Sequence, residues 1–237
     1  MGRRFGTDRR PFFIYSAPVH FLHCVLAEWA LVRPRLLRTR LGASLVLLGA
    51  ALVWLGTHGR DPLAVALHAG ALGGVLSAAF AAGSSADRAA FAIALGHPTT
   101  PLAIACGRWL SAVIPAAGLT ITCTALVGWQ LGAAAAGLAA AAAVTACALA
   151  AVLVAGAGAA FVLFLCMGLA GAAPPEALVG VAEPGALRLA VASALELGPA
   201  LWRYREVAGG DAAAVLHAAT WATLGVILSS VFVRRRA

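Results

Sequence analysis

The chain has 237 residues, of which 62% are hydrophobic and only 11% are charged, and its mean hydropathy is +0.93. About a quarter of the residues in an average soluble domain are charged, so this composition excludes an ordinary water-soluble domain and indicates a polytopic membrane protein. All 17 basic residues are arginine, against nine acids. In a membrane chain the positive-inside rule accounts for this excess without nucleic acid as a partner.

Residues 1–40 form an arginine-rich N-terminal segment ahead of the first apolar run. Within it, Val19–Arg33 predicts an amphipathic helix, with His20 and Glu28 on its polar side. The helix is too charged to cross a membrane, so we expect it to lie at the cytoplasmic interface until Pro34 turns the chain into the first span. A cytoplasmic helix packed on its own protein is the alternative. The predicted apolar side consists of Leu22, Val25, Leu26, Trp29 and Val32.

Apolar runs supply six candidate spans, since a helix needs about 20 apolar residues to cross the hydrocarbon. The 67 residues from Trp109 to Pro175 contain no charge at all, which at about 1.5 Å per residue is enough for roughly three crossings. Weak breaks at 128–130 and 155–158 divide this stretch. The predicted spans are 41–57, 62–82, 101–128, 131–154, 159–173 and 212–233.

Charge supports an even number of spans. With six, the side that holds both termini has 13 arginines against three acids, and the other side has four against six. This bias places both termini in the cytoplasm. We therefore expect a protein of the bacterial cytoplasmic (inner) membrane, folded as a single all-α transmembrane domain over residues 1–237.

Two connections are structured in the prediction. Between the second and third spans, residues 85–96 predict a short amphipathic cytoplasmic helix, with Ser84 and Ser85 as caps and Asp87 at its positive end. Gly96-His97-Pro98 ends that helix, and Pro101 begins the next. Residues 174–211 form an apolar outer connection cut by prolines, which predicts short re-entrant helices, with Trp202 and Tyr204 in an interface belt.

The sequence contains none of the common enzyme signatures for a nucleophile elbow, a zinc protease or a phosphate-binding loop. The five cysteines are scattered through apolar sequence without metal-ligand spacing, so we expect small buried side chains and no metal site. We therefore predict neither a catalytic residue nor a cofactor in this chain.

Ionisable groups inside spans are candidates for function, and only His68 and His217 qualify. Each lies toward the outer side by residue count, so a pairing is conceivable, as haem ligands, proton relay or cavity contacts. A neutral histidine bonded to the backbone of a neighbouring helix is the simpler interpretation. Thr120 and Thr124, with Thr122, Thr220 and Thr223, are candidates for lining a pathway; hydrogen bonds between helices are the commoner explanation.

The segment from Ser84 to Leu110 contains an acidic-basic pair, a short amphipathic helix, a proline-threonine turn and a glycine-arginine step into the third span. These are Asp87-Arg88, Phe91–Leu95, His97-Pro98-Thr99-Thr100 and Gly107-Arg108. In this order the four features resemble the membrane subunit of type-2 ABC exporters. Family members often have an acidic-x-x-x-Gly-Thr step where this chain has Ala89-Ala90-Phe91. The haem-exporter permease of cytochrome c maturation is a close relative within the class.

The resemblance implies that 85–96 is a coupling helix, docked on a separate ATPase subunit. The contact would use Ser85, Asp87, Arg88, Phe91, His97 and Arg108. ATP and Mg would then bind in the partner, and this chain would be a transport subunit rather than an enzyme. Two permease chains, as a homodimer or heterodimer, would open a path between them by alternating access. The uncharged spans favour a lipophilic or lipid-linked substrate. The alternative is a haem-binding or structural subunit of a membrane redox complex that uses His68 and His217.

Overall fold

Helices make up the fold of the chain. The computed structural model describes residues 17–38, 40–59, 61–82, 99–169 and 198–236, and all regular structure within them is helical, with no strand. The all-α prediction is confirmed for these residues. In chain order the elements are α1 (Ala17–Arg38), α2 (Leu41–Gly59), α3 (Pro62–Ala82), α5 (Pro101–Val127), α6 (Leu131–Ala155), α7 (Ala157–Leu169), α9 (Leu201–Tyr204), η2 (Arg205–Gly209) and α10 (Ala212–Arg236).

Five of the described helices are long and apolar enough to cross a membrane, namely α2, α3, α5, α6 and α10. They indicate a membrane protein. The fifth span predicted from sequence, at 159–173, corresponds to α7, which has 13 residues within the described part of the chain. At about 1.5 Å per residue such a helix is roughly 20 Å long and does not cross a hydrocarbon core of about 30 Å by itself.

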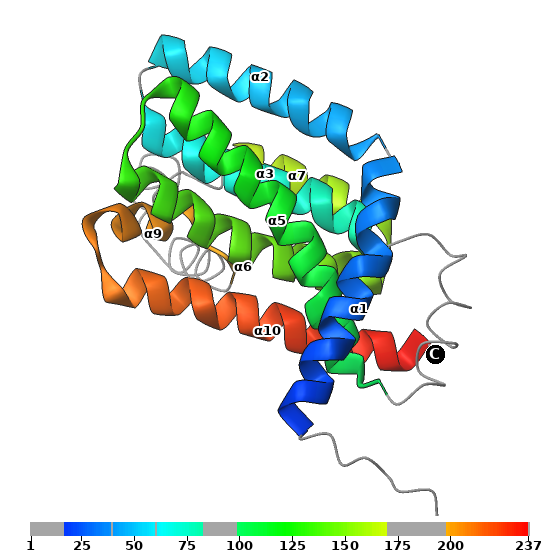
Figure 1. The fold of residues 1–237 in the computed structure, drawn as a ribbon. Helices are drawn as coiled ribbons and strands as arrows, with labels where there is room; N and C mark the ends of the chain where they lie inside the picture. Colours follow the sequence, from blue (N-terminus) through cyan, green and yellow to red (C-terminus); the bar gives the residue numbers. More distant parts are fainter. Residues whose placement is uncertain (1–16, 39, 60, 83–98, 170–197, 237) are drawn as a thin grey trace, which may run out of the picture.

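The centre of the bundle is formed by α3 and α6, and α2 and α10 lie at its edges (Figure 1). In the most apolar window of each helix, 67% of α3 and 61% of α6 is buried, against 22% for both α2 and α10. Small residues let the two central helices approach closely: a Cβ added at Gly137 of α6 would lie 2.5 Å from the carbonyl oxygen of Ala66 on α3. Such packing is typical of membrane helices, which associate through backbone contact.

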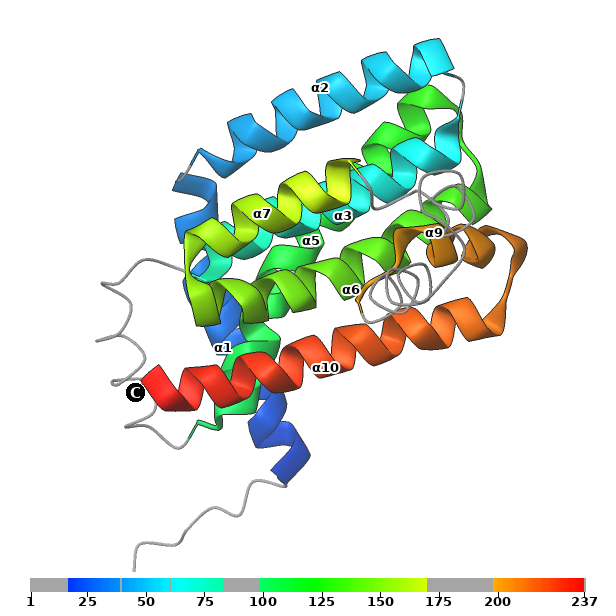
Figure 2. The same cartoon turned by 180° about the vertical axis from the view of Figure 1, so that it is seen from behind.

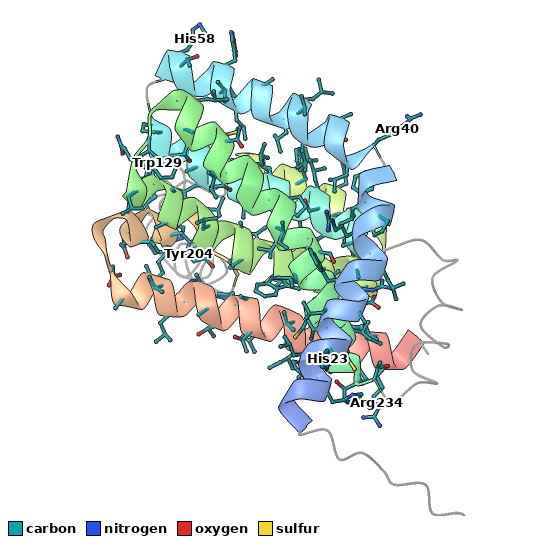
Figure 3. All side chains as sticks on the ribbon, viewed as in Figure 1. His23, Arg40, His58, Trp129, Tyr204 and Arg234 are labelled. Carbon is teal, nitrogen blue, oxygen red and sulfur yellow. The ribbon has the colours of Figure 1, made fainter. Side chains whose placement is uncertain are left out.

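The bundle has two distinct ends, visible from both sides in Figures 1 and 2. One end carries α1 and the end of α10, and the other carries α9 with the α2–α3 and α5–α6 connections; we call them the α1 end and the α9 end. Figure 3 labels His23, Arg40 and Arg234 at the α1 end. Because α6 finishes at the α1 end and α10 begins at the α9 end, the chain returns between them, and α7 covers the first part of that path (Figure 2).

Helix boundaries follow from caps in the sequence. Thr100 caps α5 by accepting from the backbone N–H of Ala103 at 3.2 Å, with Pro101 in the first turn. This is the start that the proline and threonine predict. Asp61 caps α3 in the same way, accepting from the N–H of Ala64 at 3.0 Å. Gly156, at φ +79°, separates α6 from α7 in a conformation that a side chain would strain.

Pro34 does not end the first helix, contrary to the sequence prediction. It lies inside α1, which continues to Arg38 before α2 begins at Leu41. A proline in a helix removes one hydrogen bond, to the carbonyl four residues earlier. Here that carbonyl belongs to Ala30, and both Ala30 and Pro34 are exposed. The missing hydrogen bond therefore lies on the exposed side of α1 and not in its packed face.

The outer connection is described only from residue 198 onward, so most of the predicted re-entrant segment 174–211 lies outside the described residues. Its last part forms α9 and η2, which pack on α6 and α10. Tyr204 is fully buried in the main core with Leu201, so the predicted role of Tyr204 in an interface belt is wrong. Burial raises the pKa of the Tyr204 hydroxyl above its ordinary value.

Candidate functional site

A buried ion pair joins α1 to α5 at the α1 end of the bundle. The Nε of Arg108 donates to Oε1 of Glu28 at 2.9 Å, and the two side chains are only 4% and 10% exposed. The Nη1 of the same guanidinium donates to the carbonyl of Ala82 at 2.9 Å and to that of Ala81 at 3.5 Å. Those carbonyls belong to the last two described residues of α3, and the last carbonyls of a helix generally lack a partner within it. One arginine side chain therefore connects three helices.

Gly107 allows the two helices to come close enough for this pair. A Cβ at that position would lie 2.7 Å from Cβ of Glu28 and 2.9 Å from the carbonyl oxygen of Val25. Contacts below 3.0 Å are not seen for real Cβ atoms. The Gly107-Arg108 step thus has two separate roles: the glycine provides space for α1, and the arginine provides the charge that Glu28 requires.

Glu28 lies on the buried side of α1, although the sequence predicts it on the polar side. Val25, Val32 and Leu36 are buried on the same face, and Val32 and Leu36 pack with Ala81 of α3. The carboxylate of Glu28 is tolerated on this face because the guanidinium of Arg108 both neutralises its charge and donates a hydrogen bond to it. Val25, Glu28 and Val32 thus pack α1 against the rest of the protein. This agrees with the alternative from the sequence, a helix packed on its own protein, and not with a purely interfacial helix.

A second face of α1 remains exposed and apolar. Leu22 is 57% exposed and Leu26 43%. Trp29 lies along the same side, with the guanidinium carbon of Arg33 5.4 Å from the centroid of its ring, a cation–π distance. An aromatic-arginine pair beside exposed leucines is typical of a helix at a membrane interface. The packed face of α1 agrees with the alternative of a helix on its own protein, and contact of the exposed face with a membrane interface stays a prediction.

The other residues predicted to contact an ATPase lie outside the described part of the chain. These are Ser85, Asp87, Arg88, Phe91 and His97. Only Arg108 of that set is described, and its side chain is buried against Glu28 rather than on the surface. The structure does place the two helices that flank residues 83–98, because Arg108 of α5 donates to the carbonyl of Ala82 at the end of α3.

His68 lines a cavity of about 450 Å³ between α2, α3 and α7. Its Nδ1 is 2.7 Å from the carbonyl oxygen of Ala64, one turn earlier in the same helix. The expected backbone bond is thus made within α3 and not to a neighbouring helix. The cavity is otherwise lined by apolar side chains such as Leu52 and Phe164, and by Asp61.

His217 has different neighbours, on α9 and α10. Its Nε2 accepts a hydrogen bond from Nε1 of Trp221 at 3.1 Å, and its ring lies 5.7 Å from that of Tyr204, centroid to centroid. In both views α6 lies between α3 and α10 (Figures 1 and 2). The described contacts of His68 and His217 are therefore with separate sets of side chains.

The predicted pathway threonines of α5 are buried and bond within their own helix. Thr120 donates to the carbonyl of Ala116 at 2.9 Å and Thr124 to that of Thr120 at 2.7 Å, and both side chains are fully buried. Thr220 and Thr223 of α10 are exposed and form the same bonds to Leu216 and Ala219. None of these four bonds joins two helices, contrary to the commoner explanation.

No protein-family model, curated protein or solved structure matches the chain. Function must therefore be argued from the residues. A haem held by both histidines fits them poorly, because the Nε2 of His217 already accepts from an indole and His68 lies on a different helix with other neighbours. The described residues contain no cluster of three or more His, Cys, Asp or Glu side chains suited to a metal ion.

Sequence reasoning missed Glu28 as a partner of Arg108. One signal was present: Glu28 is the only acid in the predicted amphipathic helix, and Arg108 is the last charge before the 67 uncharged residues. A lone acid and a lone base, each beside apolar sequence, are candidates for a buried pair. Nothing in either segment specifies the other as its partner.

Proposed function

We propose that the chain is the permease subunit of an ABC exporter, which forms the membrane pathway for a lipophilic or lipid-linked substrate and is driven by a separate ATPase subunit. Residues 83–98 would carry the contact with the ATPase at the cytoplasmic side. Two permease chains and two ATPases would form the working complex, in the bacterial inner membrane with both termini in the cytoplasm.

The observation that supports this proposal is the three-helix contact at Arg108. A segment that transmits force must be attached to helices that move together, and Arg108 ties the end of α3 and the start of α5 to each other and to α1. These are the two helices that residues 83–98 connect. A force on that segment would move α1, α3 and α5 together. Without the contacts of Arg108, the same force could move one flanking helix without the others.

A further point agrees with the resemblance to type-2 ABC exporters. The Gly107-Arg108 step belongs to the motif that carries it, and both residues have a specific structural role at this position. The motif therefore coincides with a buried contact between helices. This is support from two residues, and the docking residues themselves lie outside the described part of the chain.

Affinity purification of the tagged full-length chain from its own membranes tests the proposal. We expect a chain with a phosphate-binding loop to co-purify, identified by mass spectrometry, and to hydrolyse ATP faster with the permease than alone. Asp87→Ala with Arg88→Ala should abolish both results. The matched control is Arg205→Ala with Glu206→Ala, which removes an adjacent, exposed basic-acidic pair of η2 at the α9 end, also without changing net charge.

Two outcomes would overturn the proposal in different ways. An intact ATPase contact after the Asp87 and Arg88 changes would refute the role of residues 83–98. Absence of any ATPase, together with a Soret band from stoichiometric haem in the purified chain, would refute the exporter and favour the redox subunit.

A further inference from the structure

The residues that line the cavity beside His68 are those of a ligand-binding site and not of a simple packing defect. Its volume of about 450 Å³ falls in the range of roughly 300–1,000 Å³ usual for small-molecule sites, which are mostly apolar with a few placed polar groups. Apolar side chains from α2, α3 and α7 line it, and the polar groups are His68 and Asp61. A second cavity of about 500 Å³ between α2 and α5 has no histidine or carboxylate in its lining.

The bond to Ala64 fixes which nitrogen of His68 is offered to the cavity. A carbonyl oxygen only accepts, so the Nδ1 that lies 2.7 Å from it carries the hydrogen. In the neutral ring Nε2 is then an acceptor, and it lies on the edge of the ring turned away from the backbone. No described residue forms a hydrogen bond with this nitrogen.

Asp61 adds acceptors and no donor to the same cavity. One of its carboxylate oxygens accepts from the N–H of Ala64, and the other from Nη2 of Arg205 at 3.4 Å. Arg205 itself is not part of the lining. The polar lining is therefore made of acceptors, which favours a ligand that brings a donor and disfavours an anionic headgroup.

From this geometry we propose that the cavity between α2, α3 and α7 binds an uncharged or cationic amphiphile, whose hydroxyl, amide or ammonium group donates to Nε2 of His68 while its apolar chain lies along α2 and α3. The proposal concerns this chain alone and does not depend on an ATPase partner. The bound molecule would come either from the bilayer lipids or from free amphiphiles of the same chemistry.

Photolabelling of the full-length chain in phosphatidylcholine nanodiscs tests this. The probe is a sixteen-carbon alcohol with a mid-chain diazirine, and its methyl ether serves as the matched probe without a donor. Cleavage at arginine separates α2, in fragment 41–60, from α3, in fragment 61–88, and from α6, α7 and the part of α5 after Arg108, in fragment 109–188. The α2–α5 cavity has no lining residue in fragment 61–88, so label there does not come from that second cavity.

The measured quantity is the fraction of total label found in fragment 61–88. This fraction should be roughly three- to tenfold higher for the alcohol than for the ether, which is the affinity difference expected from one hydrogen bond. His68→Phe should remove that excess. His58→Phe is the control, because His58 has the same bond from Nδ1 to a carbonyl four residues earlier, at 2.7 Å, but is exposed and outside the cavity. Phosphatidylethanolamine, which carries an ammonium donor, should compete if the ligand is a bilayer lipid; competition by unlabelled alcohol alone indicates a free amphiphile.

Ala64→Leu provides a second variant that leaves His68 and its backbone bond in place. The added side chain projects from a residue of the cavity lining, so labelling of fragment 61–88 by both probes should fall. Equal labelling by alcohol and ether in the unaltered chain would overturn the proposal. So would an excess that survives His68→Phe, or an Ala64→Leu chain that labels as before.

Discussion

Glu28 and Arg108 are separated by 80 residues in sequence, and 2.9 Å separates their Oε1 and Nε atoms. Both side chains are almost entirely removed from the surroundings. Burying this ion pair costs solvation free energy. Removing only one of the two side chains costs more, because the other charge then stays buried without a partner. Because it lies where α1, α3 and α5 meet, a change to either side chain should affect the contact between these three helices.

Replacement of Glu28 or Arg108 by Ala should each destabilise the chain by about 3 kcal/mol, since each leaves a buried charge alone. The double variant should lose less than the sum of the two, with a coupling energy of about 1–3 kcal/mol. Unfolding in mixed detergent micelles, followed by circular dichroism, measures all four chains. Strictly additive losses would show that the two side chains do not interact in the folded protein.

Gly107→Ala should detach α1 from α5 without changing any charge. The added methyl group meets the backbone of α1 at Val25 as well as the side chain of Glu28, so the helices must separate, at a cost of about 1–3 kcal/mol. Gly118→Ala is the control on the same helix, because nothing lies within 4 Å of that position. Limited trypsin cleavage after the exposed Arg40, between α1 and α2, should speed up in the first variant only; equal rates would contradict the close approach.

Gly137→Ala should disturb the centre of the bundle instead of its end. The new Cβ would lie 2.5 Å from the Ala66 carbonyl oxygen and 2.5 Å from Cγ2 of Thr120. The clash involves backbone, so we expect a loss of about 1–3 kcal/mol in unfolding free energy. Gly158→Ala on α7, where nothing lies within 4 Å, should change stability little by comparison. A neutral Gly137→Ala would mean that α3 and α6 are less tightly packed than described.

Tyr204 should resist ionisation in the folded chain. Burial raises its pKa above the usual value near 10, so the folded state keeps the proton that the unfolded state releases. Stability attributable to this group is thus fully present below about pH 10 and is lost as the pH rises further. The chain has two tyrosines, so Tyr15→Phe isolates Tyr204. Tyrosinate absorbance of that variant should appear only with unfolding; a reversible band near pH 10 in folded protein would contradict the burial.

Helix bounds in the described residues could be predicted closely from the sequence, because apolar runs here end at residues with a clear stereochemical role. The span predicted at 62–82 and α3 have the same bounds, and Pro101 begins α5 after its threonine cap. Pro34 misled the prediction. Its effect depends on whether the carbonyl of Ala30 faces protein or its surroundings, which no local pattern records.

The candidate sites could be predicted much less well, because they depend on which faces meet. Two apolar stripes lie next to each other on α1, and the periodicity alone cannot say which of them packs on the protein. The stripe with Val25 and Val32 is buried and brings Glu28 with it, while Leu22 and Leu26 stay exposed. Likewise, the sequence singles out His68 as ionisable, but the cavity beside it exists only through the positions of α2 and α7.

The order in which the ribosome makes the chain gives Arg108 a further consequence. When α1, α2 and α3 have been synthesised, Arg108 has not, so its bonds to Glu28 and to the carbonyl of Ala82 cannot yet form. The N-terminal helix therefore docks in its final position only after the first turns of α5 are made. A chain halted before residue 108 would therefore lack the guanidinium that, in the complete chain, pairs with Glu28 and binds the carbonyl of Ala82.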